Sequence, residues 1–230
     1  YEGNFFLNMT DATRKSKFYS RLRTTYTERV KNAGSTRGNE WTQLEVDAMY
    51  YEGKFKGGVS NTTLTIGRQT AVVGRGIAFA NASDGIQVEF GYKRNMLKLF
   101  SVKLDRSLDD IDPGAISPPS NGHTHRRFAG LEQKWNPHPF ASPYVFYLKS
   151  WDNNARRVDP QTGEMHIYKP TFVGYGASGV LIVPQLSYFC EFIRVFGTAT
   201  GQGDKSDTTR VDAEAYDVGF RYQFRGKYAP

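Results

Sequence analysis

The sequence lacks long apolar runs, paired cysteines and clear helical periodicity, and each absence removes a class of protein. No stretch approaches the roughly 18 consecutive apolar residues of a membrane-spanning helix, because the most apolar region, 180–196, is interrupted by a proline and by charged residues. The single Cys190 excludes an intramolecular disulfide or a site built from several cysteines. The four histidines are scattered, apart from His123 and His125, which we interpret as part of a solvated loop. No metal or cofactor is therefore expected.

Aromatic residues and glycine are abundant instead. The 230 residues include 16 Phe, 14 Tyr and 23 Gly, a combination that indicates an all-β chain. The mean hydropathy of -0.56 is typical of a soluble protein. A membrane barrel has a similarly low value, because its lipid-facing residues alternate with polar ones. The net charge of +7 indicates an anionic partner, but charge alone does not distinguish nucleic acid, lipopolysaccharide and acidic sugars.

Several segments alternate apolar and polar residues over about the nine to eleven positions that a tilted membrane strand requires. In one of them, Ile86, Val88 and Phe90 share a face, and Gln87 and Glu89 lie on the opposite face. Such alternation predicts about ten or eleven strands, most of them joined in sequence as an up-and-down antiparallel sheet. The predicted strands are 4–9, 21–30, 43–51, 62–70, 86–93, 96–105, 127–135, 144–151, 166–176, 186–197 and 216–224.

The connections between these strands alternate in length. Short turns are predicted near 55–61, 94–95 and 136–142, and longer connections at 32–40, 106–126, 152–164 and 198–209. Short turns at one end and long polar loops at the other are typical of outer-membrane barrels, whereas alternation alone fits a soluble β-sandwich equally well. The sequence therefore predicts an antiparallel up-and-down transmembrane β-barrel in the bacterial outer membrane, with a single domain over residues 1–230. Within it, the proline-containing loop 109–121 is a candidate to fold toward the lumen.

One predicted hairpin carries an ordered set of short motifs. Its first strand ends in Gly67-Arg68-Gln69, a loop with Gly74 and Gly76 follows, and Asp84-Gly85 leads the next strand. The following strand contains Leu97-Lys98-Leu99-Phe100. This order resembles the alginate-export family of outer-membrane barrels, and segments 168–179, 188–191 and 213–224 look similar to later strands of that family.

The resemblance implies a monomeric barrel of about eighteen strands, whose electropositive lumen conducts an anionic polysaccharide. The sequence is shorter than such a barrel and stops at Ala229-Pro230, without the terminal aromatic residue that is usual in these proteins. We therefore expect it to be only part of the full barrel, incomplete at the C-terminal end. The alternative is a smaller barrel of about twelve strands closed by the same hairpins.

A passive channel needs a lined path rather than a catalytic group, and inward charges select solutes by field and size. Because alternate side chains of a strand point to opposite faces, Arg21, Arg23 and Arg29 are predicted to share the inward face of their strand, and we call them the arginine ladder. Alternation places Arg68 on the lipid-facing side of its strand. An arginine there destabilises a barrel by roughly 2–4 kcal/mol at the bilayer midplane, so we expect a bulge at Gly67 to turn it inward. The predicted lumen or solute-contacting residues are Arg21, Arg23, Arg29, Arg68, Glu89, Lys93, Lys98, Glu132, Lys134, Asp217 and Arg221, with Glu45, Asp47 and Lys149 also predicted inward. The alternative is that such charges pair with each other and only rigidify the wall.

The leading functional hypothesis is an outer-membrane channel for passive passage of anionic or carbohydrate-like solutes. A hypothesis of a different class is a non-conducting scaffold barrel that sheathes or docks a periplasmic or electron-transfer partner, and a third is a soluble β-sandwich binding module. The expected partners are outer-membrane lipid and lipopolysaccharide, an anionic solute or polysaccharide, and for the scaffold a periplasmic protein. Nucleic acid is not expected.

No set of residues predicts an enzyme. Asp109, Asp110 and Asp112 lack the remaining spacing of a calcium-binding loop. The Gly74-x-Gly76 pair is too short for a phosphate-binding loop and opens no helix. An enzyme built on a barrel, such as a lipase or deacylase, is the remaining minor alternative.

Overall fold

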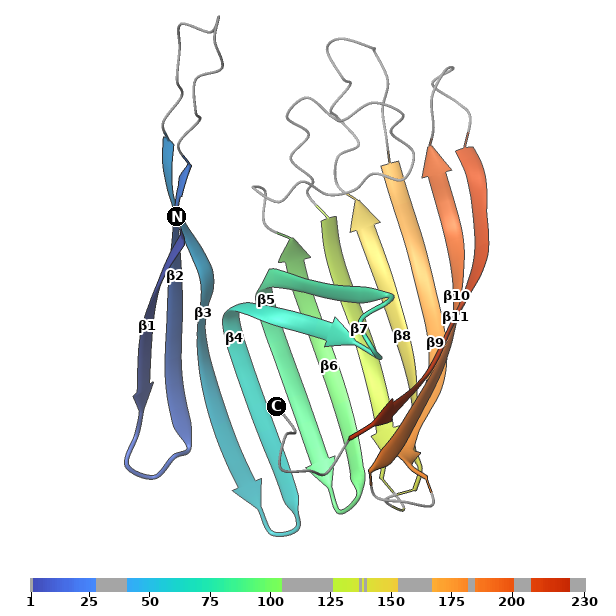
Figure 1. Ribbon diagram of the computed structural model, residues 1–230, viewed down its shortest axis with the longest axis horizontal. Helices are drawn as coiled ribbons and strands as arrows, with labels where there is room; N and C mark the ends of the chain where they lie inside the picture. Colours follow the sequence, from blue (N-terminus) through green and yellow to red (C-terminus); the bar gives the residue numbers. More distant parts are fainter. Residues whose placement is uncertain are drawn as a thin grey trace, which may run out of the picture.

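The chain folds into one antiparallel sheet of eleven strands, in which every strand is hydrogen-bonded to its neighbours in sequence (Figure 1). The computed structural model describes residues 2–27, 41–104, 126–136, 138, 140–152, 167–181, 185–200 and 208–223. The strands are β1 (Glu2–Thr10), β2 (Ser16–Thr27), β3 (Trp41–Gly57), β4 (Ser60–Val73), β5 (Phe79–Tyr92), β6 (Asn95–Leu104), β7 (Arg126–Trp135), β8 (Ser142–Asp152), β9 (Ile167–Val180), β10 (Leu186–Thr200) and β11 (Thr208–Tyr222). The predicted all-β class and up-and-down order are confirmed.

The sheet curves into an open wall rather than a closed ring (Figure 1). Its two edge strands are β1 and β11, and neither pairs with a second strand in the part of the chain that the structure describes. No helix of these residues is long and apolar enough to cross a membrane. The loop 109–121, predicted to fold toward the lumen, lies outside the described residues.

Short turns gather at one end of the wall. Tight connections join β3 to β4 and β5 to β6. The turn between β5 and β6 consists of Lys93 and Arg94, one residue earlier than the predicted turn at 94–95. At the opposite end most strands are separated by longer stretches, such as 28–40 between β2 and β3. Because antiparallel neighbours alternate direction, the tight turns between β3 and β4 and between β5 and β6 fall on the same rim, whereas the short connection 74–78 between β4 and β5 lies at the opposite end of these strands.

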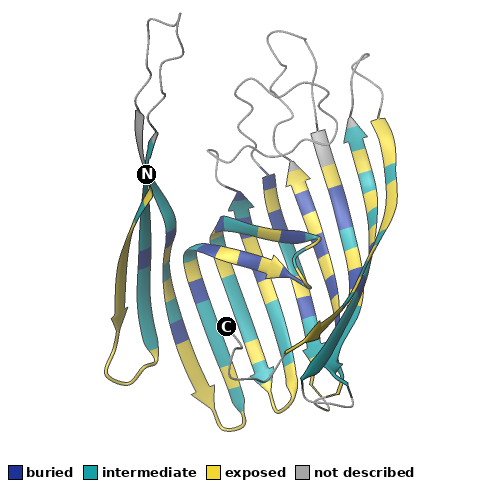
Figure 2. Ribbon diagram, viewed as in Figure 1, coloured by how far each residue is buried: buried dark blue, intermediate teal, exposed yellow. Residues whose placement is uncertain are grey.

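The two faces of the wall differ in burial, and exposed residues alternate with buried or half-buried ones along most strands (Figure 2). The buried side chains lie on the concave face, where a hairpin formed by β4 and β5 covers the sheet (Figure 1). The convex face exposes large apolar side chains, among them Ile66, Ile86, Phe90, Leu99, Leu131, Val145, Tyr147, Val173, Tyr175, Tyr216, Val218 and Phe220.

Candidate functional site

The hairpin of β4 and β5 leaves the wall and folds across its concave side (Figure 1). Strand β3 pairs with β4 only as far as Met49 and Arg68, and β5 pairs with β6 only from Ser83 onward. The pairing between β4 and β5 continues beyond these points to Val73 and Phe79. Residues 69–82 therefore form a two-stranded arm, which we call the inner hairpin.

A pair of glycines lies where the inner hairpin departs. Gly67 is opposite Gly85, and its φ of 122° lies in the region that favours glycine. A Cβ atom at Gly67 would collide with the carbonyl oxygen of Met49. The bulge predicted at Gly67 is wrong, because the register with β5 is continuous through this position. The backbone bends instead, and the neighbouring Arg68 has a half-buried side chain.

The underside of the inner hairpin is apolar. Its Ala71, Val73 and Phe79 are buried against the concave face, and the Phe79 ring lies 4.6 Å from that of Phe128 between centroids. Burying one large apolar side chain contributes about 1.5–3 kcal/mol, so this contact holds the arm against the wall. The wall supplies Phe100, Val102 and Leu104 from β6, Phe128 from β7, Phe146 and Leu148 from β8, and Ile193 from β10.

The predicted orientation of Lys149 on β8 is wrong. Lys149 was predicted inward, but it is exposed on the convex face, with its Nζ 5.6 Å from the ring centroid of Trp151. Phe146 and Leu148 occupy the concave face in its place, each at most 2% exposed. The physical reason is packing, because the apolar underside of the inner hairpin is buried against Phe146 and Leu148 on the concave face of β8.

Three carboxylates hold the tip of the inner hairpin. The Gly74 backbone N–H donates to Glu132 Oε2 of β7 at 2.9 Å. The Arg75 backbone N–H donates to Glu191 Oε2 of β10 at 2.9 Å, and Arg75 Nε donates to Asp217 Oδ2 of β11 at 3.2 Å. We call Glu132, Glu191 and Asp217 the carboxylate clamp. It connects the arm to three separate strands of the wall.

Glu191 is the most buried member of the clamp, with 2% of the residue exposed. The Tyr144 hydroxyl donates to the same Oε2 atom at 2.6 Å, so this oxygen accepts two hydrogen bonds. The guanidinium of Arg75 lies 3.3 Å from the centroid of the Phe189 ring. A buried carboxylate is tolerated only when hydrogen bonds and charges compensate it, and the hairpin tip supplies part of that compensation.

Lys98 joins the clamp from β6. Its Nζ lies 3.0 Å from Glu132 Oε2 and donates to the Val72 carbonyl oxygen at 2.7 Å. The Lys98 side chain is 11% exposed, so this ion pair is largely shielded from water. The structure thus brings together three predicted residues, Lys98, Glu132 and Asp217, around the hairpin tip.

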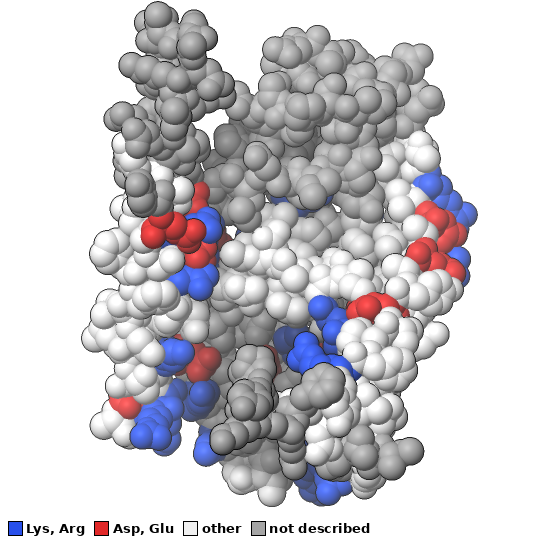
Figure 3. Space-filling view, viewed as in Figure 1, with Lys and Arg blue, Asp and Glu red and all other residues white. Residues whose placement is uncertain are grey.

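The predicted arginine ladder of β2 is paired with acids of β3. Arg21 lies 2.7 Å from Asp47, and Arg23 lies 2.6 Å from Glu45. A register shift beside Arg21 makes Asp47 the extra residue of a β-bulge. Figure 3 shows that basic and acidic side chains also lie close together in several other places on this view of the molecule. Arg29, the third member of the ladder, lies outside the described residues.

The remaining predicted residues lie apart from the clamp. Glu89 and Lys134 are half-buried on β5 and β7, and Arg221 is exposed near the end of β11. Lys93 occupies the turn between β5 and β6 with a φ of 52°, and its Nζ lies 5.2 Å from the Tyr92 ring centroid. It therefore lies on the rim with the short turns rather than along a strand of the wall.

Sequence reasoning missed Arg75 and Tyr144 and left Glu191 outside the predicted set. The only local signals are Gly74 and Gly76, which mark a tight turn around Arg75, and the position of Glu191 as a lone acid in an apolar segment. Neither signal indicates that the two residues meet. Among the described residues, no group of three or more His, Cys, Asp or Glu side chains could hold a metal ion.

No protein-family model matches this chain, and no curated protein is significantly similar to it in sequence. The resemblance to alginate-export barrels, carried by Gly67-Arg68-Gln69 and Asp84-Gly85, therefore stays a prediction from short motifs. Chemically, the site offers a charged concave surface narrowed by a docked arm.

Proposed function

We propose that this chain forms the wall of an outer-membrane channel for passive passage of anionic or carbohydrate-like solutes, with the inner hairpin as its constriction. The observation that carries the proposal is the contrast between the two faces of the wall. The convex face exposes large apolar residues such as Ile86 and Val218, at 47% and 67% exposure. A surface of this kind is unfavourable in water but suits the lipid-facing belt of a barrel.

The concave face supports the same proposal. It carries the paired charges of β2 and β3 and the clamp around the hairpin tip. Charges of both signs along a path select solutes by their field, as expected of a channel. An anionic polysaccharide, as the family resemblance implies, is one solute class that fits the proposal.

Closure of the wall is part of the proposal. In a lipid bilayer, every backbone N–H and C=O group needs a hydrogen-bond partner within the protein. The outer edges of β1 and β11 therefore need pairing strands in a membrane, and such pairing would complete a barrel. Lipid and lipopolysaccharide would then contact the convex face.

Conductance across a planar bilayer tests the proposal. The wild-type protein is expected to open a channel, and replacing both Arg21 and Arg23 with Ala should lower its anion preference. The physical reason is that this change removes two positive charges, which lie 2.7 Å from Asp47 and 2.6 Å from Glu45, from the concave face. The matched control removes two arginines that do not line the concave face, by Arg127→Ala together with Arg194→Ala. A barrel that inserts but never conducts contradicts the channel.

A second candidate function is a non-conducting scaffold barrel that docks a periplasmic or electron-transfer partner. The observation that favours it is the apolar core between the inner hairpin and the wall, because this core fills part of the space that a channel would leave open. Replacing residues 70–82 with a short glycine linker separates the two functions. A channel gains conductance when the arm is removed, whereas a scaffold remains closed to ions.

A further inference from the structure

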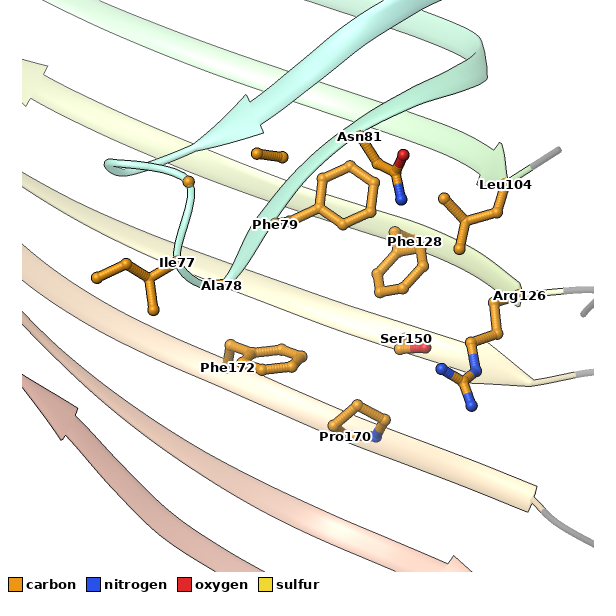
Figure 4. A pocket seen from close by; sticks show the side chains of 12 residues that line it. Ile77, Ala78, Phe79, Asn81, Leu104, Arg126, Phe128, Ser150, Pro170 and Phe172 are labelled. Carbon is orange, nitrogen blue, oxygen red and sulfur yellow. The ribbon is translucent and has the colours of Figure 1, made fainter. Parts of the chain in front are cut away.

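A cavity of about 320 Å³ lies between the inner hairpin and the wall (Figure 4). One side is formed by the turn and first residues of β5, from Gly76 to Asn81. The other side is formed by residues of β6 to β9 near the rim that carries the longer connections. None of its lining residues belongs to the carboxylate clamp, so the cavity is a separate site.

The body of the cavity is aromatic. Phe79, Phe128 and Phe172 surround it, and Phe79 and Phe128 are tilted by 41° with centroids 4.6 Å apart (Figure 4). Leu104 and Ile77 extend the apolar lining. Aromatic rings in offset or tilted contact stabilise one another by about 0.5–1.5 kcal/mol beyond simple burial, so this lining favours a planar aromatic guest.

One end of the cavity is polar. Arg126 and Ser150 lie there on adjacent strands, 6% and 1% exposed respectively (Figure 4). Among the described residues, the Ser150 hydroxyl has no hydrogen-bond partner. A buried hydroxyl without a partner is unfavourable and is satisfied by an acceptor atom of a ligand. A guanidinium beside it presents a fork of donors that matches a carboxylate.

We propose that this cavity binds a small aromatic monocarboxylate, with its ring among the three phenylalanines and its carboxylate at Arg126 and Ser150. The volume lies at the lower end of the 300–1,000 Å³ that is typical of small-molecule sites, so the ligand has a single ring. The inference rests on the proposed function in one respect, because the channel is the route by which the ligand reaches the cavity. The binding itself does not depend on conduction.

Calorimetric titration of the intact protein in detergent with benzoate tests the site. Benzoate is expected to bind with a dissociation constant of about 1 mM or below. Benzamide has the same shape without the charge and should bind about tenfold more weakly or worse. Cyclohexanecarboxylate has the charge without the planar ring and should bind about threefold more weakly or worse. Equal affinities for benzoate and benzamide, or no heat with benzoate up to about 10 mM, would overturn the proposal.

Substitutions locate the binding. Arg126→Met should weaken benzoate binding about tenfold or more, and Ser150→Ala about threefold or more. Arg127→Met is the matched control, because this neighbouring arginine is exposed and does not line the cavity. Circular dichroism of the sheet checks that each variant folds. If Arg126→Met misfolds, the affinity of Ser150→Ala for benzoate tests the proposal in its place. Unchanged affinity in the folded variants would assign benzoate to another place.

The two proposals fail separately. Benzoate binding by a protein that never conducts refutes only the channel. Conduction by a protein that does not bind benzoate refutes only the aromatic carboxylate site.

Discussion

Replacing Glu191 with Gln should release the tip of the inner hairpin. In the wild-type protein, the Arg75 backbone N–H and the Tyr144 hydroxyl both donate to Glu191 Oε2, and the residue is 2% exposed. Glutamine has nearly the same shape and keeps one accepting oxygen. It removes the negative charge that makes both hydrogen bonds strong.

The size of the effect on the hairpin follows from the Arg75 bond, because the Tyr144 bond joins two strands of the wall and persists when the hairpin is released. A hydrogen bond to a charged group contributes roughly 1.5–3 kcal/mol, and one between neutral groups roughly 0.5–1.5 kcal/mol. The Arg75 bond should therefore weaken by about 1–1.5 kcal/mol. This shifts the equilibrium between docked and released hairpin roughly 5- to 13-fold toward release.

Trypsin provides an assay that does not depend on conduction, because Arg75 at the tip is itself a cleavage site. Cleavage of a transiently opened segment follows its open population when closing is fast. The rate of cleavage after Arg75, followed by mass spectrometry, should rise by the same factor in Glu191→Gln. In a bilayer, the same variant should spend more time at a higher conductance.

Glu89→Gln is the matched control, because it removes one negative charge from β5 at a residue that is not part of the clamp. Trypsin should cleave this variant after Arg75 at the wild-type rate. Equal cleavage rates after Arg75 in the wild-type protein and both variants would refute the view that Glu191 holds the hairpin.

Three further changes test the packing, the bend and the convex face. Phe79→Ala should weaken docking of the inner hairpin by about 3–5 kcal/mol and accelerate cleavage after Arg75, with the sheet signal in circular dichroism retained; unchanged cleavage would contradict the packing argument. Gly67→Ala should cost about 1–3 kcal/mol, because its φ of 122° disfavours a side chain, and a thermal midpoint equal to that of the wild-type protein would contradict this. Leu131→Arg should destabilise the protein in lipid by roughly 2–4 kcal/mol, measured by urea unfolding in vesicles, and no loss would argue against lipid at this face.

The sequence by itself determined the strands and their order. Residues two apart in a strand share a face, so the alternation around Ile86 and Val88 reports local backbone geometry directly. The tight turn between β5 and β6 was likewise predictable to within one residue of its position at Lys93 and Arg94, because a tight turn between alternating segments leaves a hairpin as the connection. These features depend on neighbours along the chain, and the structure confirms them.

Only the tertiary structure decided which residues meet. Alternation along one strand predicts the face on which a side chain lies, but not the residue that it contacts on the next strand. The ion pair of Arg21 with Asp47, which lies at a bulge in β3, could therefore not be predicted from β2. The same holds for the inner hairpin, because its path depends on a bend at Gly67 and on contacts with strands far along the chain. Glu191 is 116 residues from Arg75 in sequence, and their contact exists because the wall curves around the arm.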